Sequence, residues 1–165
     1  VGVGPLTRDQ AIEWGVVGPV ARASGLDIDV RRDEPYLVYD QLDFTPALEQ
    51  SGDVHARVLV RVAEMLESIR LVETALARMP AGPIAALDGW PVIPPGETTI
   101  RIEAPRGEAI YHVVSDGGPT PARVKIRTPS FVNIPAIEAM VPGQQLADLA
   151  IIQASVDPCI SCTDR

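Results

Sequence analysis

The most constraining feature of this sequence is a long helical periodicity between residues 53 and 79. Its apolar side chains recur at intervals of three and four residues, at Val54, Val58, Val62, Met65, Leu66, Ile69, Val72 and Leu76. This spacing places them along one stripe of an amphipathic α-helix. Arg57, Arg61 and Glu64 lie off the stripe, where side chains of opposite charge can pair one turn apart. Pro80 ends the helix because proline lacks the N–H that the next turn needs.

A small antiparallel sheet is predicted after this helix. Short runs rich in Ile, Val and Thr occupy residues 98–103, 108–115 and 122–128. The turn sequence Asp116-Gly117-Gly118 separates the second run from the third. Together with the long helix, these runs predict an α+β fold that is mainly helical and carries one small antiparallel β-sheet.

The remaining segments predict shorter elements. Thr7 to Gln10 has the form of a capping box, in which both side chains bind backbone N–H groups at a helix start. Residues 26–50 show no sustained period and predict an irregular segment. A proline-rich connector is expected at residues 81–96, and two short helices at residues 134–140 and 144–154.

The composition excludes several classes of protein. The chain has 165 residues, with 46% hydrophobic and 22% charged, which is typical of a globular domain and not of a disordered tail. Its formal net charge of -8 would repel a phosphate backbone, so we expect no nucleic-acid partner. We also expect no membrane span, because no apolar run approaches about 18 residues. Since the sequence begins at Val1 without a Met, we expect an excised fragment that forms one domain.

The two cysteines, Cys159 and Cys162, lie within the last seven residues. A Cys-x-x-Cys pair can turn both sulfurs toward one metal, which indicates metal or redox chemistry. Neither His55 nor His112 is followed by a second His at zinc-finger spacing, so a zinc ribbon is unsupported. A thioredoxin-like role would place the pair directly after a strand, whereas here it follows a predicted helix.

The end of the sequence resembles a known family. Residues 157–165, Asp-Pro-Cys-Ile-Ser-Cys-Thr-Asp-Arg, are similar to the C-terminal signature of nickel-iron hydrogenase large subunits. The resemblance implies that Cys159 is a terminal thiolate on nickel and that Cys162 bridges nickel and iron. Soft sulfur ligands suit this metal pair. The implied cofactor is a nickel-iron centre with cyanide and carbon monoxide ligands.

Two upstream segments resemble the same family in the same order. Residues 103–107, Glu-Ala-Pro-Arg-Gly, are similar to a motif whose arginine lies over the bimetallic centre, which implies that role for Arg106. Without the resemblance, Arg106 would be interpreted as a surface ion-pair partner of Glu103. Residues 128–133 are similar to the segment that lines the cyanide pocket, which implies that Pro129 and Ser130 position the diatomic ligands and that Ser130 donates a hydrogen bond.

The N-terminal half indicates a branch of the family. Residues 15–25 and 40–44 are similar to segments shared by energy-converting hydrogenases and the quinone-binding large subunit of complex I. That complex I subunit lacks the paired cysteines, so Cys159 and Cys162 favour the membrane-bound, energy-converting hydrogenases. The sequence departs from a complete large subunit because it has no second Cys-x-x-Cys pair. We therefore expect the fragment alone to be metal-free and inactive.

The resemblance implies the following assignment for residues 1–165. They form the C-terminal portion of a hydrogenase large subunit that catalyses reversible oxidation of dihydrogen to protons and electrons. The implied partners are an iron-sulfur small subunit, the membrane subunits of an ion-translocating complex, and maturation factors that include a nickel-dependent protease. The implied location is cytoplasmic and peripheral, on the inner face of the cell membrane.

Two alternatives stay open. One is a non-catalytic subunit that shapes a quinone pocket, related to the large subunit of complex I, the NADH:quinone oxidoreductase. The other is a binding module that uses Cys159 and Cys162 for a structural zinc or an interchain disulfide. Nickel and iron in the full-length protein would exclude the first, and thiol titration with zinc analysis tests the second.

Overall fold

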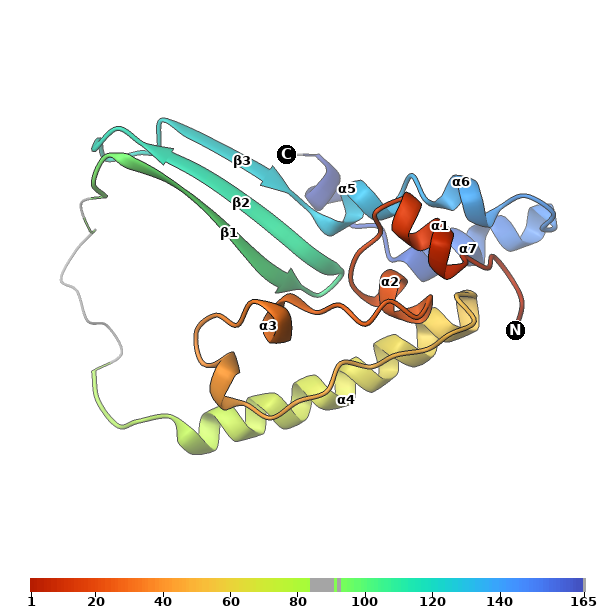
Figure 1. Ribbon diagram of the computed structural model, residues 1–165, viewed down its shortest axis with the longest axis horizontal. Coiled ribbons are helices and arrows are strands. Elements are labelled where there is room, and N and C mark those ends of the chain that lie inside the picture. The colour runs from red at the N-terminus through yellow and green to blue at the C-terminus, as the bar shows by residue number, and fades with distance from the viewer. Residues whose placement is uncertain (84–90, 92, 165) are drawn as a thin grey trace.

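The long helix and the three-stranded sheet form two sides of the molecule, and short helices join them at one end (Figure 1). The computed structural model describes residues 1–83, 91 and 93–164. Its elements in chain order are α1 (Arg8–Glu13), α2 (Pro19–Ala23), α3 (Val30–Asp33), η1 (Tyr39–Gln41), α4 (Val54–Arg78), β1 (Gly96–Ala104), β2 (Gly107–Ser115), β3 (Arg123–Arg127), α5 (Pro129–Asn133), α6 (Ile137–Met140), η2 (Leu146–Asp148), α7 (Leu149–Val156) and α8 (Ile160–Thr163). The predicted mainly helical α+β fold is confirmed.

Helix α4 is the long helix expected from the periodicity. The side chain of Asp53 caps its start by accepting a hydrogen bond from the Ala56 N–H, at 2.8 Å. The apolar stripe, however, is not the side that this chain buries. Its members are exposed from the second turn onward, namely Val58, Val62, Met65, Leu66, Ile69, Val72 and Leu76. Helices α2 and α7 pack instead against the face that carries Arg57 and Val60.

Charged side chains one turn apart pair within α4 at Glu67 and Arg70, but the pairing expected for Glu64 is wrong. Glu64 does not bind Arg57 or Arg61 but forms an ion pair with Arg22 of α2, at 2.5 Å. Arg57 is fully buried and donates to the Ser155 hydroxyl and to two backbone carbonyls. These residues lie far apart in sequence, so spacing along the helix could not indicate their pairing.

The predicted sheet is confirmed, with antiparallel strands in the order β1-β2-β3. Ala104 pairs with Gly107, so the first hairpin closes tightly around Pro105 and Arg106. Side chains alternate between the two faces of the strands. Glu103 at the end of β1 lies on the face that meets α3, and Glu108 opposes it on β2.

The shorter elements differ from expectation in detail. The capping box at Thr7 and Gln10 is confirmed. The segment 26–50, expected to be irregular, contains α3 and η1, because the Asp29 side chain caps α3 by accepting from the Arg31 N–H. The two helices expected at residues 134–140 and 144–154 are present as α6 and as α7, which η2 precedes, and α5 is an additional short helix before them. The expected connector at 81–96 lies largely outside the described residues.

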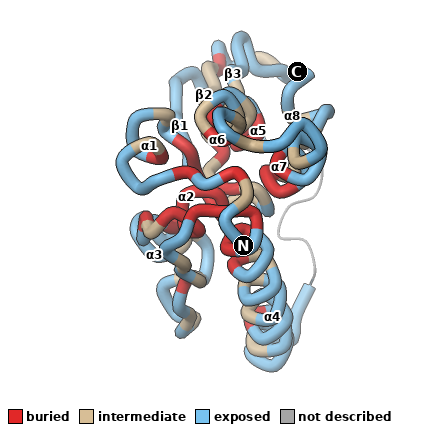
Figure 2. Tube along the Cα trace, turned by 90° about the vertical axis from the view of Figure 1, so that its right-hand side faces the viewer, coloured by how far each residue is buried: buried red, intermediate tan, exposed pale blue. Residues whose placement is uncertain are grey.

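The core lies where the short helices meet the start of α4, as the buried segments in Figure 2 show. Leu6, Val20, Met140, Ile152 and Val156 are among its most buried side chains, each at most 1% exposed. Because Ile152 and Val156 belong to α7, the core fixes the end of this helix, directly before the cysteine motif.

Within the described part of the chain, no helix is long and apolar enough to cross a membrane.

Candidate functional site

The two cysteines lie on a single turn that follows α7. Asp157 ends that helix in a left-handed conformation, with φ of 56°. Cys159 then caps α8, and its Sγ accepts a hydrogen bond from the Cys162 N–H at 3.3 Å. Both cysteines are free and half-buried. The turn therefore presents two sulfur atoms close together.

The segment that begins at Thr128 holds this turn in place. The Ser130 hydroxyl accepts a hydrogen bond from the Cys159 N–H at 3.0 Å, and the Thr128 hydroxyl donates to the Cys162 carbonyl at 2.6 Å. Ser130 is 2% exposed, and Pro129 opens α5 beside it. The residues expected to line a cyanide pocket thus lie directly against the cysteine turn.

Arg106 approaches the same turn from the β1–β2 hairpin. Its Nε donates to the Asp157 carbonyl at 2.8 Å, and its Nη2 donates to Asp157 Oδ1 at 3.2 Å. Arg106 is not a partner of Glu103, which binds Arg22 instead. The structure therefore brings Arg106 to the loop that leads to Cys159.

A close backbone crossing positions the Arg106 hairpin. A Cβ added to Gly18 would lie 2.3 Å from the Gly107 Cα, and both glycines have positive φ, at 66° and 124°. Asn133 of α5 bridges the crossing through hydrogen bonds with both backbone groups of Val17 and with the Arg106 carbonyl. Only glycine fits this approach, because any side chain would meet backbone.

Two arginines of α4 fix the end of α7. Arg61 donates to the carbonyls of Ser155 and Val156, each at 3.1 Å, and its Nη1 lies 3.6 Å from Asp157. Arg57 donates to the Ser155 hydroxyl at 2.8 Å. The sequence alone did not assign these arginines or Asp157 to the site. The Asp-Pro-Cys motif does contain Asp157, but nothing local to α4 indicates what its arginines bind.

The two thiols differ in acidity. Hydrogen bonds from Cys162 and Ser161 lower the pKa of Cys159 to about 7, and the same bond to Cys159 raises the pKa of Cys162. A thiolate, rather than a thiol, is the form that binds metals. The pair thus offers two soft sulfur donors, one of them ionised close to neutral pH.

These donors fit part of a thiolate metal site. No group of three or more Cys, His, Asp or Glu side chains able to hold a metal occurs among the described residues. Cys159 and Cys162 are the two neighbouring sulfur donors that the described residues offer at this turn. Nickel and iron in thiolate sites prefer soft sulfur donors of this kind.

Comparison with known proteins identifies the family. The family described as "Respiratory-chain NADH dehydrogenase, 49 Kd subunit" matches residues 1–91 and 87–165, nearly the whole chain. The chain belongs to this family. It spans about half the length of the curated members that it matches.

Members of this family with different activities are similar to the chain. The carbon monoxide-induced hydrogenase of Rhodospirillum rubrum is 46% identical over 99% of this chain and 45% of its own. A subunit of the F(420)H(2) dehydrogenase of Methanosarcina mazei is 44% identical over 100% of this chain and 46% of its own. A subunit of an NADH-quinone oxidoreductase of Rhizobium meliloti is 39% identical, over 99% of this chain and 47% of its own.

A chain in a solved structure has the same fold. A chain of the membrane-bound sulfane sulfur reductase, an archaeal respiratory membrane complex, superposes with a TM-score of 0.90 and 39% identity, over 99% of this chain and 46% of that one. The predicted relationship to energy-converting hydrogenases and complex I is therefore confirmed at the level of the family. Its members named above are subunits of oxidoreductases.

Proposed function

We propose that this 49 Kd-family chain is the part of a nickel-iron hydrogenase large subunit, of the energy-converting type, that carries two of the metal ligands. The observation that carries the proposal is the cysteine turn itself, in which Cys159 and Cys162 lie beside Arg106 and its partner Asp157. The similarity to a hydrogenase over nearly the whole chain supports it.

Each residue of the site has a separate role in this proposal. Cys159 and Cys162 would hold nickel and iron as thiolates. When bound, that metal pair supplies the chemistry that splits dihydrogen reversibly into protons and electrons. Ser130 orients Cys159 through its backbone N–H and, with Pro129, lines the position of the diatomic ligands. Arg106 keeps a permanent positive charge with several N–H donors beside the site, which stabilises negative charge.

The complete enzyme requires parts beyond this chain. We propose that another segment of the full-length subunit supplies a second Cys-x-x-Cys pair, since this chain supplies two ligands. An iron-sulfur small subunit would accept the electrons, and maturation factors with a nickel-dependent protease would load the metals. The structural relative belongs to a respiratory membrane complex, which supports peripheral attachment to membrane subunits.

Metal analysis of the full-length protein tests the proposal. We expect nickel and iron in equal amounts, together with hydrogen-dependent reduction of a dye. Cys162→Ser should abolish both, because it removes one metal ligand. Ile160→Ala is the matched control, since this side chain is exposed within the same turn. Full hydrogen uptake by Cys162→Ser would refute the proposal.

A second candidate is a subunit that shapes a quinone pocket without metal. The 39% identity to an NADH-quinone oxidoreductase subunit favours it. In that case the full-length protein would hold neither nickel nor iron and would bind a quinone analogue. The metal content of one purified sample therefore separates the two candidates.

A further inference from the structure

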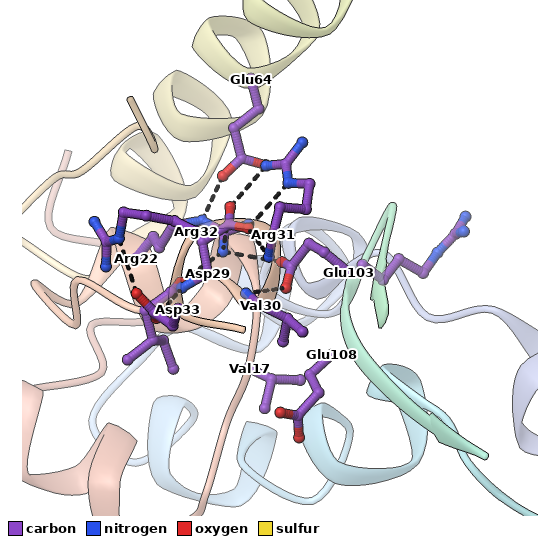
Figure 3. A network of polar contacts seen from close by, with 12 residues as sticks. Val17, Arg22, Asp29, Val30, Arg31, Arg32, Asp33, Glu64, Glu103 and Glu108 are labelled. Atoms are coloured by element: carbon purple, nitrogen blue, oxygen red, sulfur yellow. Dashed lines mark hydrogen bonds and ion pairs between the residues drawn. The ribbon is translucent and has the colours of Figure 1, made fainter. Parts of the chain in front are cut away.

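A buried ion cluster lies next to the cysteine turn. Glu103, at the end of β1, has a side chain that is 5% exposed, and its Oε1 lies 2.9 Å from Arg22 Nη1. The Arg22 side chain, itself 1% exposed, also contacts Asp29 at 3.4 Å and Glu64 at 2.5 Å. The other carboxylate oxygen of Glu103 accepts from the Val30 N–H at 3.4 Å (Figure 3). The cluster therefore joins α2, α3, α4 and β1.

The cluster contains three carboxylates but only two arginines among its ion pairs. Asp29, Glu64 and Glu103 surround Arg22, and Arg31 contributes a second guanidinium through its pair with Asp29 at 2.7 Å. Buried charge without a counter-charge is expensive, so an excess carboxylate favours binding a proton. Burial raises the pKa of Glu103, and the opposing effect of Arg22 does not reverse this.

Glu103 is weakly bound by hydrogen bonds for a buried carboxylate. Its Oε1 lies 2.9 Å from Arg22 Nη1, but the contact is poorly aligned for a hydrogen bond and serves mainly as an ion pair, which lowers the pKa of Glu103 without offsetting the effect of burial. The charged and titratable groups that face Glu103 from the surrounding elements are Arg22, Asp29, Arg31, Tyr36, Arg61, Glu64, Glu108 and Asp157. Burial of Glu103 among these groups raises its pKa, which favours its protonated form.

Glu103 lines two separate cavities. The first has a volume of about 400 Å³, enough for several water molecules, and Arg61, Glu64 and Asp157 share its wall. Asp157 lies two residues before Cys159 and contacts Arg106. This cavity thus connects the cluster with the loop that carries the cysteines.

The second cavity leads from Glu103 toward the surface. It has a volume of about 120 Å³ and is lined by Asp33, Glu34 and Glu108, along with Arg101. The side chains of Asp33 and Glu34 are 44% and 56% exposed. The acidic side chains in the wall of the second cavity attract protons. Glu103 is the carboxylate that lines both the second cavity and the first cavity.

We propose that Glu103 is a proton-holding residue that passes protons between the Asp157 end of the first cavity and the acidic second cavity. In each transfer an O–H bond of a hydrated proton breaks while an O–H bond forms on Glu103, and the reverse step releases the proton on the other side. No electrons move, since those of the reaction leave by the separate electron acceptor. The proposal rests on the proposed hydrogenase function for the source of the protons.

The test uses the full-length protein with Glu103→Gln, Glu103→Asp and the control Glu97→Gln. Glu97 lies at the exposed start of the same strand. Infrared titration measures protonation directly through the carbonyl band of an uncharged carboxyl group. We expect wild type to show a band that persists above the usual titration range of glutamate, that shifts in Glu103→Asp and that is absent in Glu103→Gln.

Kinetics provide the second measurement. Exchange of deuterium gas with water protons should slow on the order of 100-fold in Glu103→Gln, with partial recovery in Glu103→Asp and a larger solvent isotope effect. Glu97→Gln should match wild type. Nickel and iron content and melting temperature are measured for each variant, so that a loss of folding or of metal is recognised.

The outcomes separate this proposal from the one on which it rests. A Glu103 carboxyl that titrates in the ordinary range, or a folded, metal-loaded Glu103→Gln with wild-type exchange, overturns the proton-holding role. Full-length protein without nickel and iron overturns the hydrogenase function, whereas the infrared titration still decides whether Glu103 holds a proton. If Glu103→Gln does not fold, the infrared band of Glu103→Asp decides between the outcomes. A shifted band supports the proton-holding role of Glu103, and an unshifted band overturns it.

Discussion

Arg106 and Asp157 are joined by a hydrogen bond of 2.8 Å from the arginine Nε to the aspartate carbonyl, across 51 residues of sequence. Their side chains also form an ion pair at 3.1 Å. This contact ties the β1–β2 hairpin to the loop that carries Cys159. The Arg106 guanidinium is held near the cysteines by a hydrogen bond to a backbone carbonyl. A change of the Asp157 side-chain rotamer would leave this bond in place.

Arg106→Lys should impair activity more than stability. Lysine keeps the charge but loses the planar set of donors that binds Asp157. Because both side chains are partly exposed, we expect unfolding free energy to fall by less than about 1 kcal/mol. Hydrogen-dependent dye reduction by the full-length protein should fall on the order of 100-fold. Arg123→Lys, at an exposed position of β3, is the control, and equal activity in both variants would contradict the role of Arg106.

Gly18→Ala should destabilise the protein strongly. The new Cβ would lie 2.3 Å from the Gly107 Cα, and the alanine would have to adopt the positive φ of Gly18. We expect a loss of about 3 kcal/mol or more in denaturant unfolding, from backbone strain and overpacking together. Gly15→Ala is the matched control, since Gly15 also has positive φ but nothing within 4 Å, and should lose only about 1 kcal/mol. Equal losses in both variants would show that the crossing is not tightly packed.

Arg57→Leu should also destabilise the protein. Burial lowers the pKa of Arg57 to about 10, which leaves it charged at neutral pH. The substitution would leave the Gly4 and Gly52 carbonyls and the Ser155 hydroxyl without this donor, at an expected loss of about 3 kcal/mol. Arg78→Leu, at the exposed end of the same helix, should change the unfolding free energy by less than about 0.5 kcal/mol. Similar melting curves for the two variants would argue against this role.

Asp53→Asn should show a stability difference that depends on pH. Burial opposes ionisation of Asp53, but hydrogen bonds from the N–H groups of Gly2 and Ala56 lower its pKa below the ordinary value of 3.8. Ionised Asp53 therefore stabilises the protein above pH 3.8, and this contribution disappears as the pH falls through the lower folded-state pKa. We expect Asp53→Asn to be less stable by about 1 kcal/mol at neutral pH, because asparagine accepts fewer of these bonds.

Chemical denaturation at neutral pH and well below pH 3.8 measures this difference, which should vanish in acid. Asp148→Asn is the control, because Asp148 stands at the start of α7 without a side-chain capping bond. A difference of the same size at both pH values would mean that the charge of Asp53 does not contribute.

Local patterns determined much of this protein. The spacing of apolar residues predicted α4, short runs rich in Ile, Val and Thr predicted the sheet, and the capping box predicted the start of α1. The Asp-Pro-Cys motif indicated Cys159 and Cys162 as the site. Each of these signals involves residues that are close together in the sequence, so it can be recognised from the sequence alone.

Only the tertiary structure decided which groups meet at the site. The apolar stripe marked α4 as amphipathic, yet this chain buries the side with Arg57, whose partners lie up to 98 residues away. The pairing of Arg106 with Asp157, and of Glu103 with Arg22, likewise joins distant segments. Periodicity shows that a helix has two faces, whereas the burial of a face depends on which other elements cover it. Those contacts are set by packing in three dimensions, and no spacing along the chain records them.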